Sequence, residues 1–319
     1  MKKILLVVVI IIFITLLLPL AIVWLIGGSG EGQSPIESGT VSVYVSEEDC
    51  VKDMDINEYL KCVVAAEMPA AFEEEALKAQ ACAARTYTVV RQASAHAAHP
   101  QADVCTDSGC CQAYVERQAA ETRWGISAGT YSAKISQAVA DTDGLGILYQ
   151  GAPIQAVFFS SAPGQTADAV AVWGSQVDYL KSVSSPRGTR SPTTAARWSS
   201  RRRRSAAGCS PPIPGADLSG DPSGWFGTPA SSGGAVTSIP VGGVTLTGSQ
   251  VRTLFSLRSA AFTVAWDGTS FIFSVTGYGH GVGMSQYGAN AMAKEGSSFR
   301  DILTWYYTGA QVDDLWAES

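Results

Sequence analysis

The chain has 319 residues, of which 46% are hydrophobic and 16% are charged, and its formal net charge is −6. This balance excludes a disordered chain, which needs low hydrophobicity and high charge, and the acidic excess gives a nucleic-acid partner no general electrostatic support. The seven cysteines are too few for a disulfide-stapled mini-domain, and their odd number argues against complete pairing.

The one stretch that is apolar enough to span a membrane lies at the N-terminus, so a polytopic membrane protein is excluded. Its 23 residues, 4–26, carry no charge and are long enough to cross a bilayer as a helix. Lys2 and Lys3 precede it and predict a cytoplasmic N-terminus, with the rest of the chain outside the cytoplasm. No small-x-small cleavage site follows, which favours an uncleaved anchor (1–26) over a cleaved signal peptide. The Gly/Ser-rich residues 27–39 are expected to be a flexible linker.

Residues 40–319 are predicted to form one domain that begins with a strand and two helices. Valines alternate with polar residues at 41–45, which is typical of a strand. The apolar spacing at 56–67 is helical, and the Met-Pro pair that follows ends this helix. A second helix is expected over 72–96, because three glutamates near its start suit the positive end of a helix dipole.

The later part of the domain predicts two hairpins and two helices. The hairpins are expected at 145–160, around a Gly-Ala-Pro turn, and at 261–276, around an Asp-Gly turn. A glycine-rich loop then leads to helices at 286–294 and 298–305. Helices come first, hairpins come later, and strands and helices do not alternate regularly. The predicted fold class is therefore α+β, with one transmembrane helix followed by helices packed with antiparallel β-hairpins.

Glu67 has the clearest potential for catalysis. It follows Leu60, Val63 and Val64 by seven, four and three residues, so it shares the apolar face of its predicted helix. Loss of hydration on that face favours the protonated carboxyl group and raises its pKa, which suits a general acid near neutral pH. The alternative is a buried structural glutamate that is paired with Arg85.

A second candidate site consists of His99, Cys105 and Cys111, spaced as H-x5-C-x5-C, with Cys110 adjacent. Two thiolates and one imidazole from a short loop are good zinc ligands, and three ligands leave a fourth position open. The alternative is a disulfide between Cys105 and either Cys110 or Cys111 in an oxidising compartment. Three further ligand candidates are more consistent with core positions on helices: Cys62, Cys82 and His96.

The glycine-rich loop, residues 277–288, lacks the Gly-Lys-Ser/Thr of a phosphate loop and the spacing of the dinucleotide fingerprint. Four of its residues offer hydrogen bonds suited to a neutral polar ligand such as a sugar: His280, Ser285, Gln286 and Tyr287. Ser160 and Ser161 add two hydroxyl groups at the end of a predicted strand. A Ser-His-Asp hydrolase is conceivable, but no G-x-S-x-G elbow surrounds either serine. The alternative for the loop is a hairpin-to-helix connection without function.

Several motifs together resemble the stage II sporulation protein D family. The first is Glu67-Met-Pro-Ala70, followed by Ala76-Leu-Lys-Ala-Gln-Ala-Cys-Ala-Ala-Arg-Thr-Tyr87. Another, Gly279-His-Gly-Val-Gly-Met-Ser-Gln-Tyr-Gly-Ala289, lies near the C-terminus. His99-Pro-x-Ala-Asp-Val-Cys-Thr-Asp107 and Val172-Trp-Gly-Ser175 are similar to segments of members from clostridia-like spore formers. The resemblance covers residue 40 to the C-terminus apart from one segment, and its motifs are highly specific as a set.

The resemblance implies a membrane-anchored peptidoglycan lytic transglycosylase that acts in engulfment of the forespore. Such an enzyme cleaves glycan strands without stem peptides between N-acetylmuramic acid and N-acetylglucosamine, and it leaves a 1,6-anhydro product. The implied location is the cell membrane, single-pass, with the catalytic domain on the mother-cell side of the septum. The implied partners are a cell-wall amidase/endopeptidase and a polytopic membrane protein. The implied catalytic residue is Glu67, and His99, Cys105 and Cys111 would bind a mainly structural zinc ion.

Seven residues are expected to orient the sugar or stabilise charge: Arg85, Tyr87, Ser160, Ser161, His280, Gln286 and Tyr287. Two other functional classes stay open. One is a zinc-dependent cell-wall amidase or peptidase, which an open fourth metal position would favour. The other is a non-catalytic glycan-binding scaffold of the engulfment complex.

The segment 187–209 reads RGTRSPTTAARWSSRRRRSAAGC and has seven arginines, against 15 Lys and Arg in the remainder (22 − 7 = 15). Four consecutive arginines, 201–204, usually indicate a solvated basic loop or an anionic partner. The resemblance instead implies an acidic turn and a strand here, and a GC-rich gene read one base out of frame would replace them with Arg, Ser, Pro and Ala. We therefore expect a compensated pair of frameshifts, with 187–212 unstructured. The alternative is a genuine basic loop.

Overall fold

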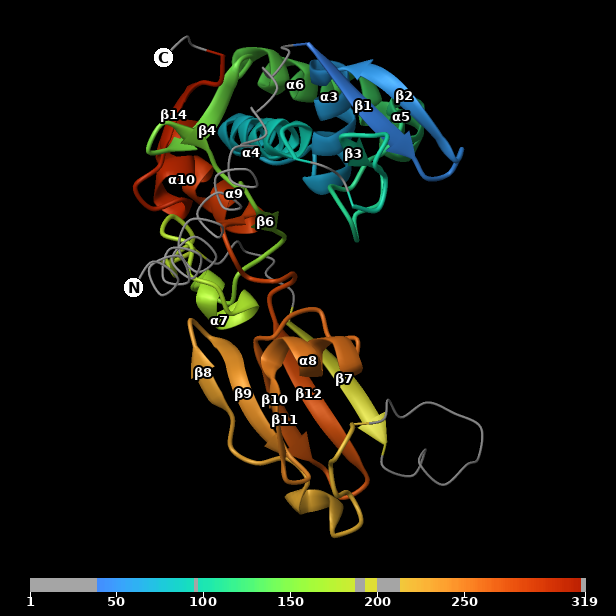
Figure 1. Ribbon diagram of the computed structural model, residues 1–319, viewed down its shortest axis with the longest axis vertical. Helices are drawn as coiled ribbons and strands as arrows, with labels where there is room; N and C mark the ends of the chain where they lie inside the picture. Colours follow the sequence, from blue (N-terminus) through green and yellow to red (C-terminus); the bar gives the residue numbers. More distant parts are fainter. Residues whose placement is uncertain (1–38, 95–96, 187–192, 200–212, 317–319) are drawn as a thin grey trace, which may run out of the picture. The chain divides into compact units, whose positions relative to one another are not determined.

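The computed structural model describes residues 39–94, 97–186, 193–199 and 213–316, and for 193–199 it describes only the backbone (Figure 1). Within these ranges, no helix is both long enough and apolar enough to cross a membrane. The predicted anchor, and the predicted linker up to residue 38, lie outside the described residues, so both stay predictions.

Helix α4 (Glu74–Gln92) lies at the centre of the helical part (Figure 1). Many of its buried residues are alanines, whose small side chains let neighbouring helices approach closely. Four helices contact it: α3 (Ile56–Glu67), α6 (Ala128–Asp141), α9 (Gln286–Lys294) and α10 (Phe299–Tyr306). The second predicted helix is confirmed, although it ends before the expected residue 96.

Helix α3 begins and ends where local chemistry requires. The Asp55 carboxylate accepts hydrogen bonds from two N–H groups of the first turn and caps the helix. The helix ends at Glu67 because Met68, which precedes a proline, is extended. Its buried apolar residues are Ile56, Tyr59, Leu60, Val63 and Val64. Two further helical segments, α5 (Arg117–Trp124) and the 3-10 turn η2 (Gly125–Ser127), precede α6 in the chain. The short helix α7 (Ala169–Trp173) follows later, after residue 160.

A three-stranded sheet anchors the cysteine-containing loop. Strand β1 (Thr40–Val45) pairs antiparallel with β2 (Cys50–Asp55) and parallel with β3 (Val104–Cys105). Because Tyr44 and Cys105 are register partners, the start of the loop is fixed to the edge of β1. The predicted strand at 41–45 is confirmed.

Two further small sheets lie beside the helices. Strand β4 (Leu145–Tyr149) pairs antiparallel with β5 (Ala152–Pro153) and with β14 (Gln311–Asp314). The first predicted hairpin is therefore confirmed only for a short β4–β5 ladder. The rest of it is wrong, because β6 (Phe158–Phe159) pairs in parallel with β13 (Met284–Ser285) of the glycine-rich loop.

The second predicted hairpin is confirmed: β11 (Phe262–Trp266) pairs antiparallel with β12 (Ser270–Thr276). On its other side, β12 pairs along its length with β7 (Thr193–Ser199). The expectation that 187–212 is unstructured is therefore wrong for the seven residues of β7. The other residues of that segment lie outside the described ranges.

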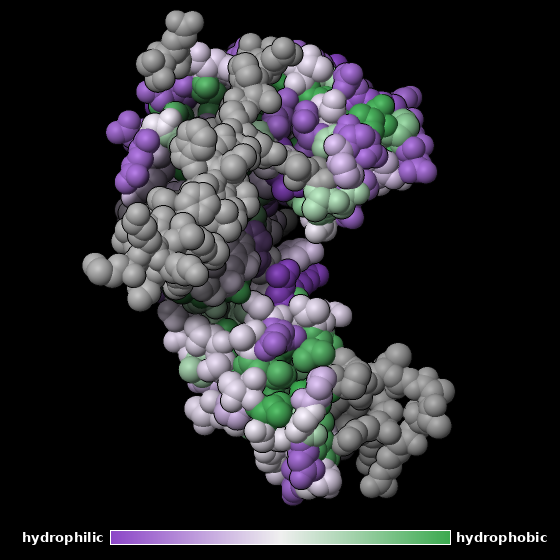
Figure 2. Space-filling model, in the orientation of Figure 1, coloured by the Kyte–Doolittle hydropathy of each residue, from purple (hydrophilic) through white to green (hydrophobic). Residues whose placement is uncertain are grey.

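A second sheet packs against this one. It consists of β8 (Ala230–Ser232), β9 (Ala235–Val241) and β10 (Val244–Thr247). The 3-10 turn η4 (Pro222–Gly224) precedes this sheet in the chain, and α8 (Gly248–Leu254) follows β10 directly. Its core is apolar and rich in aromatic rings: Trp225, Val236, Ile239, Val241, Val251, Leu257, Phe262, Phe271, Phe273 and Val275. Apolar side chains also gather at the surface over α8, β10 and β11 (Figure 2). The described residues form a mixed α+β fold, as predicted.

Candidate functional site

A cleft of about 580 Å³ lies beside the C-terminal end of α3. This volume is in the range of ligand pockets, about 300–1,000 Å³. The walls come from α3, α4, the loop at 108–113, β6, α8 and the glycine-rich loop. Five of the residues predicted to act on substrate line the cleft: Glu67, Tyr87, Ser160, His280 and Gln286.

The glycine-rich loop reaches the cleft because it runs closely against β6. A Cβ atom at Gly283, which has φ +76°, would lie 2.1 Å from the Val157 carbonyl oxygen. A Cβ atom at Gly279, which has φ +114°, would lie 2.7 Å from the side chain of Phe159. Glycine is required at both positions by backbone conformation and by space. This close packing places Gln286, the first residue of α9, at the cleft.

Glu67 is the last residue of α3 and carries the only carboxyl group among the described residues of the cleft wall. Its Oε1 accepts a hydrogen bond from the Ala113 backbone N–H at 2.7 Å, and its Oε2 accepts one from the Gln286 side-chain amide at 3.4 Å. Burial raises the pKa of Glu67 above its ordinary value, and the two hydrogen bonds offset only part of this effect. The environment therefore suits a general acid.

Gln286 is held in place by a second glutamine. Its Nε2 donates to Gln80 Oε1 at 3.2 Å and to Glu67 Oε2 at 3.4 Å, and Gln286 is only 4% exposed. Gln80 lies on α4 and is fully buried. The two glutamines thus fix the orientation of the Glu67 carboxyl group from α4 and α9. Gln80 was not among the residues predicted from the sequence, although a glutamine among the alanines of this helix was a usable signal.

Arg85 does not line the cleft. It is fully buried, and within the described residues no ion pair joins it to Glu67. Its guanidinium donates hydrogen bonds to groups of α3, α6, the residue after α6 and the first residue of β4: Asn57 Oδ1, Thr142 Oγ1 and the carbonyl oxygens of Val139, Thr142 and Leu145. The expected contact with the sugar does not fit this position, and the alternative of a Glu67–Arg85 pair is wrong.

His280 lines the cleft as a neutral ring. The Val282 N–H donates to its Nδ1 at 3.2 Å, so Nε2 carries the proton and donates to the Phe158 carbonyl oxygen at 2.9 Å. Burial lowers the pKa of His280 to about 4. Phe159 and Trp173 pack beside the ring, with centroid distances of 5.6 and 5.5 Å. Both ring nitrogens are engaged by backbone, which makes His280 a wall of the cleft rather than a proton donor.

The other predicted substrate residues divide into two pairs. Tyr87 and Ser160 line the cleft, and burial raises the pKa of the Tyr87 hydroxyl group. Ser161 is 2% exposed and lies outside the cleft wall. Tyr287 also lies outside it, and its ring packs edge-to-face on Phe72 with a centroid distance of 5.0 Å. Only the first pair is placed to touch a ligand in the cleft.

Three thiols of the cysteine loop come together. The sulfur atoms of Cys105, Cys110 and Cys111 all lie within 4.8 Å of one another. Three sulfurs at such distances fit a tetrahedral zinc site with a fourth position for another ligand. Burial raises the pKa of Cys105 to about 12, so a bound metal ion would have to displace its proton. His99 is outside this group, and its ring stacks on Tyr44 with a centroid distance of 3.9 Å.

The cysteine loop also positions Glu67. Cys111 lines the cleft, and two residues later the Ala113 N–H donates to the Glu67 carboxylate. This contact could not be predicted from the sequence, because a backbone donor has no side-chain signature.

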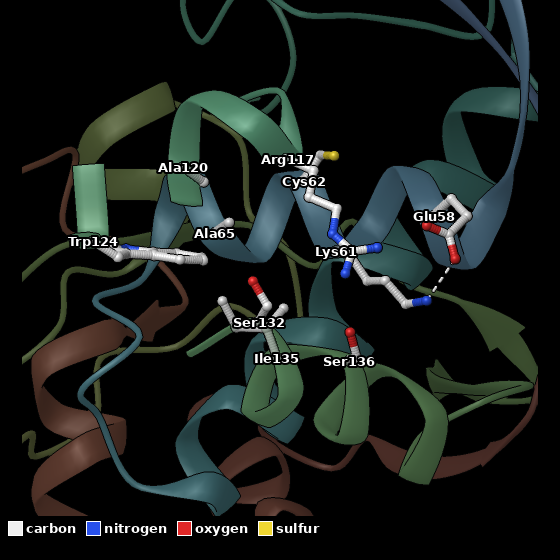
Figure 3. A pocket seen from close by; sticks show the side chains of 10 residues that line it. All are labelled: Glu58, Lys61, Cys62, Ala65, Arg117, Ala120, Trp124, Ser132, Ile135 and Ser136. Carbon is white, nitrogen blue, oxygen red and sulfur yellow. Dashed lines mark hydrogen bonds and ion pairs between the residues drawn. The ribbon is translucent and has the colours of Figure 1, made fainter. Parts of the chain in front are cut away.

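A second pocket, of about 40 Å³, lies between α3, α5 and α6 (Figure 3). It has room for about one water molecule and not for a sugar ring. Cys62 lines it, and Lys61 is paired with Glu58 at 2.5 Å beside it. Cys82 is buried elsewhere, with its sulfur 3.5 Å from the Leu145 carbonyl oxygen. Neither Cys62 nor Cys82 belongs to the thiol group.

Arg252 and Tyr278 also line the cleft and were missed by sequence analysis. Arg252 belongs to α8, which lies outside the motifs that resemble the family. The sequence indicates this helix only by the capping box that Thr247 and Gln250 form at its start. Tyr278 lies between two glycines of the glycine-rich loop and is 47% exposed.

Residues 44–149 match the family model described as Stage II sporulation protein (SpoIID). The chain is 38% identical to Stage II sporulation protein D of Bacillus subtilis (strain 168), over 90% of this chain and 83% of that protein. It is 36% identical to Stage II sporulation protein D of Bacillus amyloliquefaciens, over 88% of this chain and 80% of that protein. It is also 29% identical to the amidase enhancer of Bacillus subtilis (strain 168), over 79% of this chain and 40% of that protein.

Proposed function

The chain belongs to the stage II sporulation protein D family, and on that premise we propose that it is a peptidoglycan lytic transglycosylase. The names of its relatives support a role in sporulation and an association with the cell wall. The proposed substrate is a glycan strand without stem peptides. The enzyme cleaves it between N-acetylmuramic acid and N-acetylglucosamine during engulfment of the forespore and leaves a 1,6-anhydro end.

The observation that carries this proposal is the lone carboxyl group of the cleft. Among the described residues that line it, Glu67 is the one carboxylic acid. Glycosidases that use water generally need a second carboxylate, at about 5–10 Å from the first. In a lytic transglycosylase the nucleophile is the C6 hydroxyl group of the substrate itself, so one carboxyl group can serve both steps.

The protonated Glu67 first donates its proton to the glycosidic oxygen as the bond to the anomeric carbon of N-acetylmuramic acid breaks. The resulting carboxylate then accepts the proton of the C6 hydroxyl group, whose oxygen attacks the anomeric carbon and closes the 1,6-anhydro ring. The N–H of Ala113 and the amide of Gln286 stabilise the carboxylate between the two steps. Burial favours its return to the acid.

The proposed zinc ion has a structural role. Cys105 and Cys111 would hold it together with Cys110 or His99, and it would fix the loop that presents the Ala113 N–H to Glu67. Zinc sites built mainly from thiolates are typically structural. This chemistry of the ligand set favours the transglycosylase over the zinc-dependent amidase or peptidase.

The proposed setting is the cell membrane, with residues 1–26 as an uncleaved single-pass anchor and the domain on the mother-cell side of the septum. The proposed partners are a cell-wall amidase/endopeptidase and a polytopic membrane protein of the engulfment machinery. An amidase partner fits the proposed substrate, because stem peptides must be removed before such strands exist. The similarity to a protein named amidase enhancer supports this link.

The test is mass analysis of products from glycan strands freed of stem peptides. The wild-type protein is expected to give ends lighter by one water molecule than hydrolytic ends. Glu67→Gln is expected to lower turnover by at least 100-fold, as for loss of a general acid and base, with its fold intact by circular dichroism. Glu47→Gln, which changes an exposed glutamate, is the matched control. Unchanged turnover in folded Glu67→Gln would reject the mechanism, and strand binding without any product would favour the scaffold function.

A further inference from the structure

Arg252 is a cation in the cleft wall that has no acidic partner among the residues that the structure describes. It lies in the last turn of α8, and its side chain lines the cleft together with Glu67. Within the described residues its guanidinium makes no ion pair. A partly buried guanidinium that lacks a carboxylate has lost hydration without compensation.

Three other described arginines are engaged by acceptors. Arg117 is paired with Glu121 at 3.0 Å, Arg300 donates to the Val312 carbonyl oxygen, and Arg85 is surrounded by acceptors. Position in the last turn of a helix suits a cation, but that effect requires only charge near the helix end. The helix dipole therefore does not explain why the guanidinium of Arg252 lines the same cleft as Glu67.

The wall that carries Arg252 is positively charged at its rim as well. Arg258 lies over the ring of Tyr278, with 5.5 Å between its guanidinium carbon and the ring centroid, and Tyr278 lines the cleft. His280 next to them is neutral, because burial lowers its pKa to about 4. A negatively charged group of a ligand is therefore attracted to the α8 wall, whereas the α3 wall offers it only the acid Glu67.

Removal of a stem peptide changes the substrate in one chemical respect at each N-acetylmuramic acid: the amide of the lactyl group becomes a free carboxylate. A guanidinium matches a carboxylate with two parallel N–H···O hydrogen bonds, whereas an amide offers one acceptor oxygen and no charge. We propose that Arg252 binds this lactyl carboxylate and thereby selects glycan strands without stem peptides, an inference that rests on the proposed function.

The experiment measures binding separately from turnover. Full-length protein with Glu67→Gln is titrated with strands freed of stem peptides, and with the same strands after their carboxylates have been converted to neutral methylamides. The expected dissociation constant is at least tenfold higher for the neutral strands. Adding Arg252→Gln should weaken binding of the charged strands by a similar factor and abolish the preference. Arg252→Lys should restore part of it, because a lysine keeps the charge but not the fork.

Arg123→Gln, which removes an exposed arginine of α5 outside the cleft, is the matched control for loss of charge. Thermal unfolding checks that each variant is folded, and Arg252→Lys keeps the test informative if Arg252→Gln is unstable. The inference is overturned if the folded Arg252→Gln variant still prefers charged strands. It is also overturned if the Glu67→Gln protein with Arg252 intact binds charged and neutral strands equally. Turnover of the wild-type protein is followed in parallel. A carboxylate preference that depends on Arg252, without anhydro products, would reject the proposed function and leave only the binding of the carboxylate by Arg252.

Discussion

The protonation of Glu67 is decided by two opposed effects within a few ångströms. Burial of the side chain disfavours the carboxylate, while the N–H of Ala113 and the amide of Gln286 favour it. Burial has the larger effect, so the pKa is raised. One carboxyl group can then be an acid before bond cleavage and a stabilised base after it, as the proposed mechanism requires.

The raised pKa of Glu67 has a consequence for stability. The native state binds this proton more tightly than the unfolded chain does, so the contribution is fully present below the ordinary pKa of 4.5 and is lost as pH rises through the higher native pKa. The glutamine in Glu67→Gln cannot titrate. As pH rises from 4.5 through the native pKa of Glu67, the free energy of unfolding of this variant should therefore increase relative to that of the wild type. Urea unfolding from pH 4 to pH 8 measures the difference. Parallel pH profiles for the two proteins would contradict the expected shift, and Glu47→Gln is the control.

Arg85 should act on stability and not on catalysis. Arg85→Met removes the donors of several buried hydrogen bonds and leaves their oxygen partners unsatisfied. The expected loss in the free energy of unfolding is about 3 kcal/mol or more, while turnover per folded molecule stays unchanged. Chemical denaturation and activity assays at low temperature measure the two effects. An Arg85→Met variant with normal stability and weakened strand binding would contradict this prediction and indicate that Arg85 binds substrate.

At the scale of elements, the cysteine loop connects the proposed metal site to Glu67, the proposed catalytic acid. The loop starts at β3, which is paired with β1, and two residues beyond Cys111 it donates the Ala113 hydrogen bond to Glu67. Anything that loosens the loop between these two points should therefore also loosen the carboxyl group.

We expect the purified protein to carry about one zinc ion, and Cys105→Ser or Cys111→Ser to lose it and to lower the stability of the domain. Elemental analysis and thermal unfolding measure both effects, and Cys62→Ser, outside the thiol group, is the control. Cys110→Ser and His99→Ala identify the third ligand. The variant that removes the true ligand loses the zinc ion, and the other variant keeps it. Mass spectrometry that finds a disulfide within the loop and no metal would refute the zinc proposal.

At the scale of the whole molecule, the cleft is assembled from parts that are far apart in the chain. Its wall includes Glu67 from α3, the loop at 108–113, β6, Arg252 from α8 and Gln286 from α9. The two sheets after residue 192 therefore have a functional role in the proposal, because α8 follows β10 directly. Their packing determines where Arg252 lies.

The arginine-rich segment also belongs to this scale. Strand β7 pairs with β12 through its backbone, and such pairing is compatible with many side chains. The predicted frameshifts therefore stay open to test. Resequencing is expected to reveal two compensating one-base shifts that bracket the segment 187–212 and restore an acidic sequence. Clean reads in the present frame, together with a peptide that spans residues 197–201, would refute the prediction, and peptides from 262–276 serve as the control.

The sequence by itself determined the features that depend on local spacing: the helix whose apolar face carries Glu67, the Asp-Gly hairpin at 261–276, and the glycines of the loop before Gln286. Only the tertiary structure placed Arg85 in the core and Arg252 in the cleft. The reason is physical. Periodicity reports which face of an element is buried, but it does not report which atoms meet there. The contact between Ala113 and Glu67 joins a backbone donor to a side chain 46 positions away, and that between Gln286 and Glu67 spans 219. Both exist only once the helices have packed.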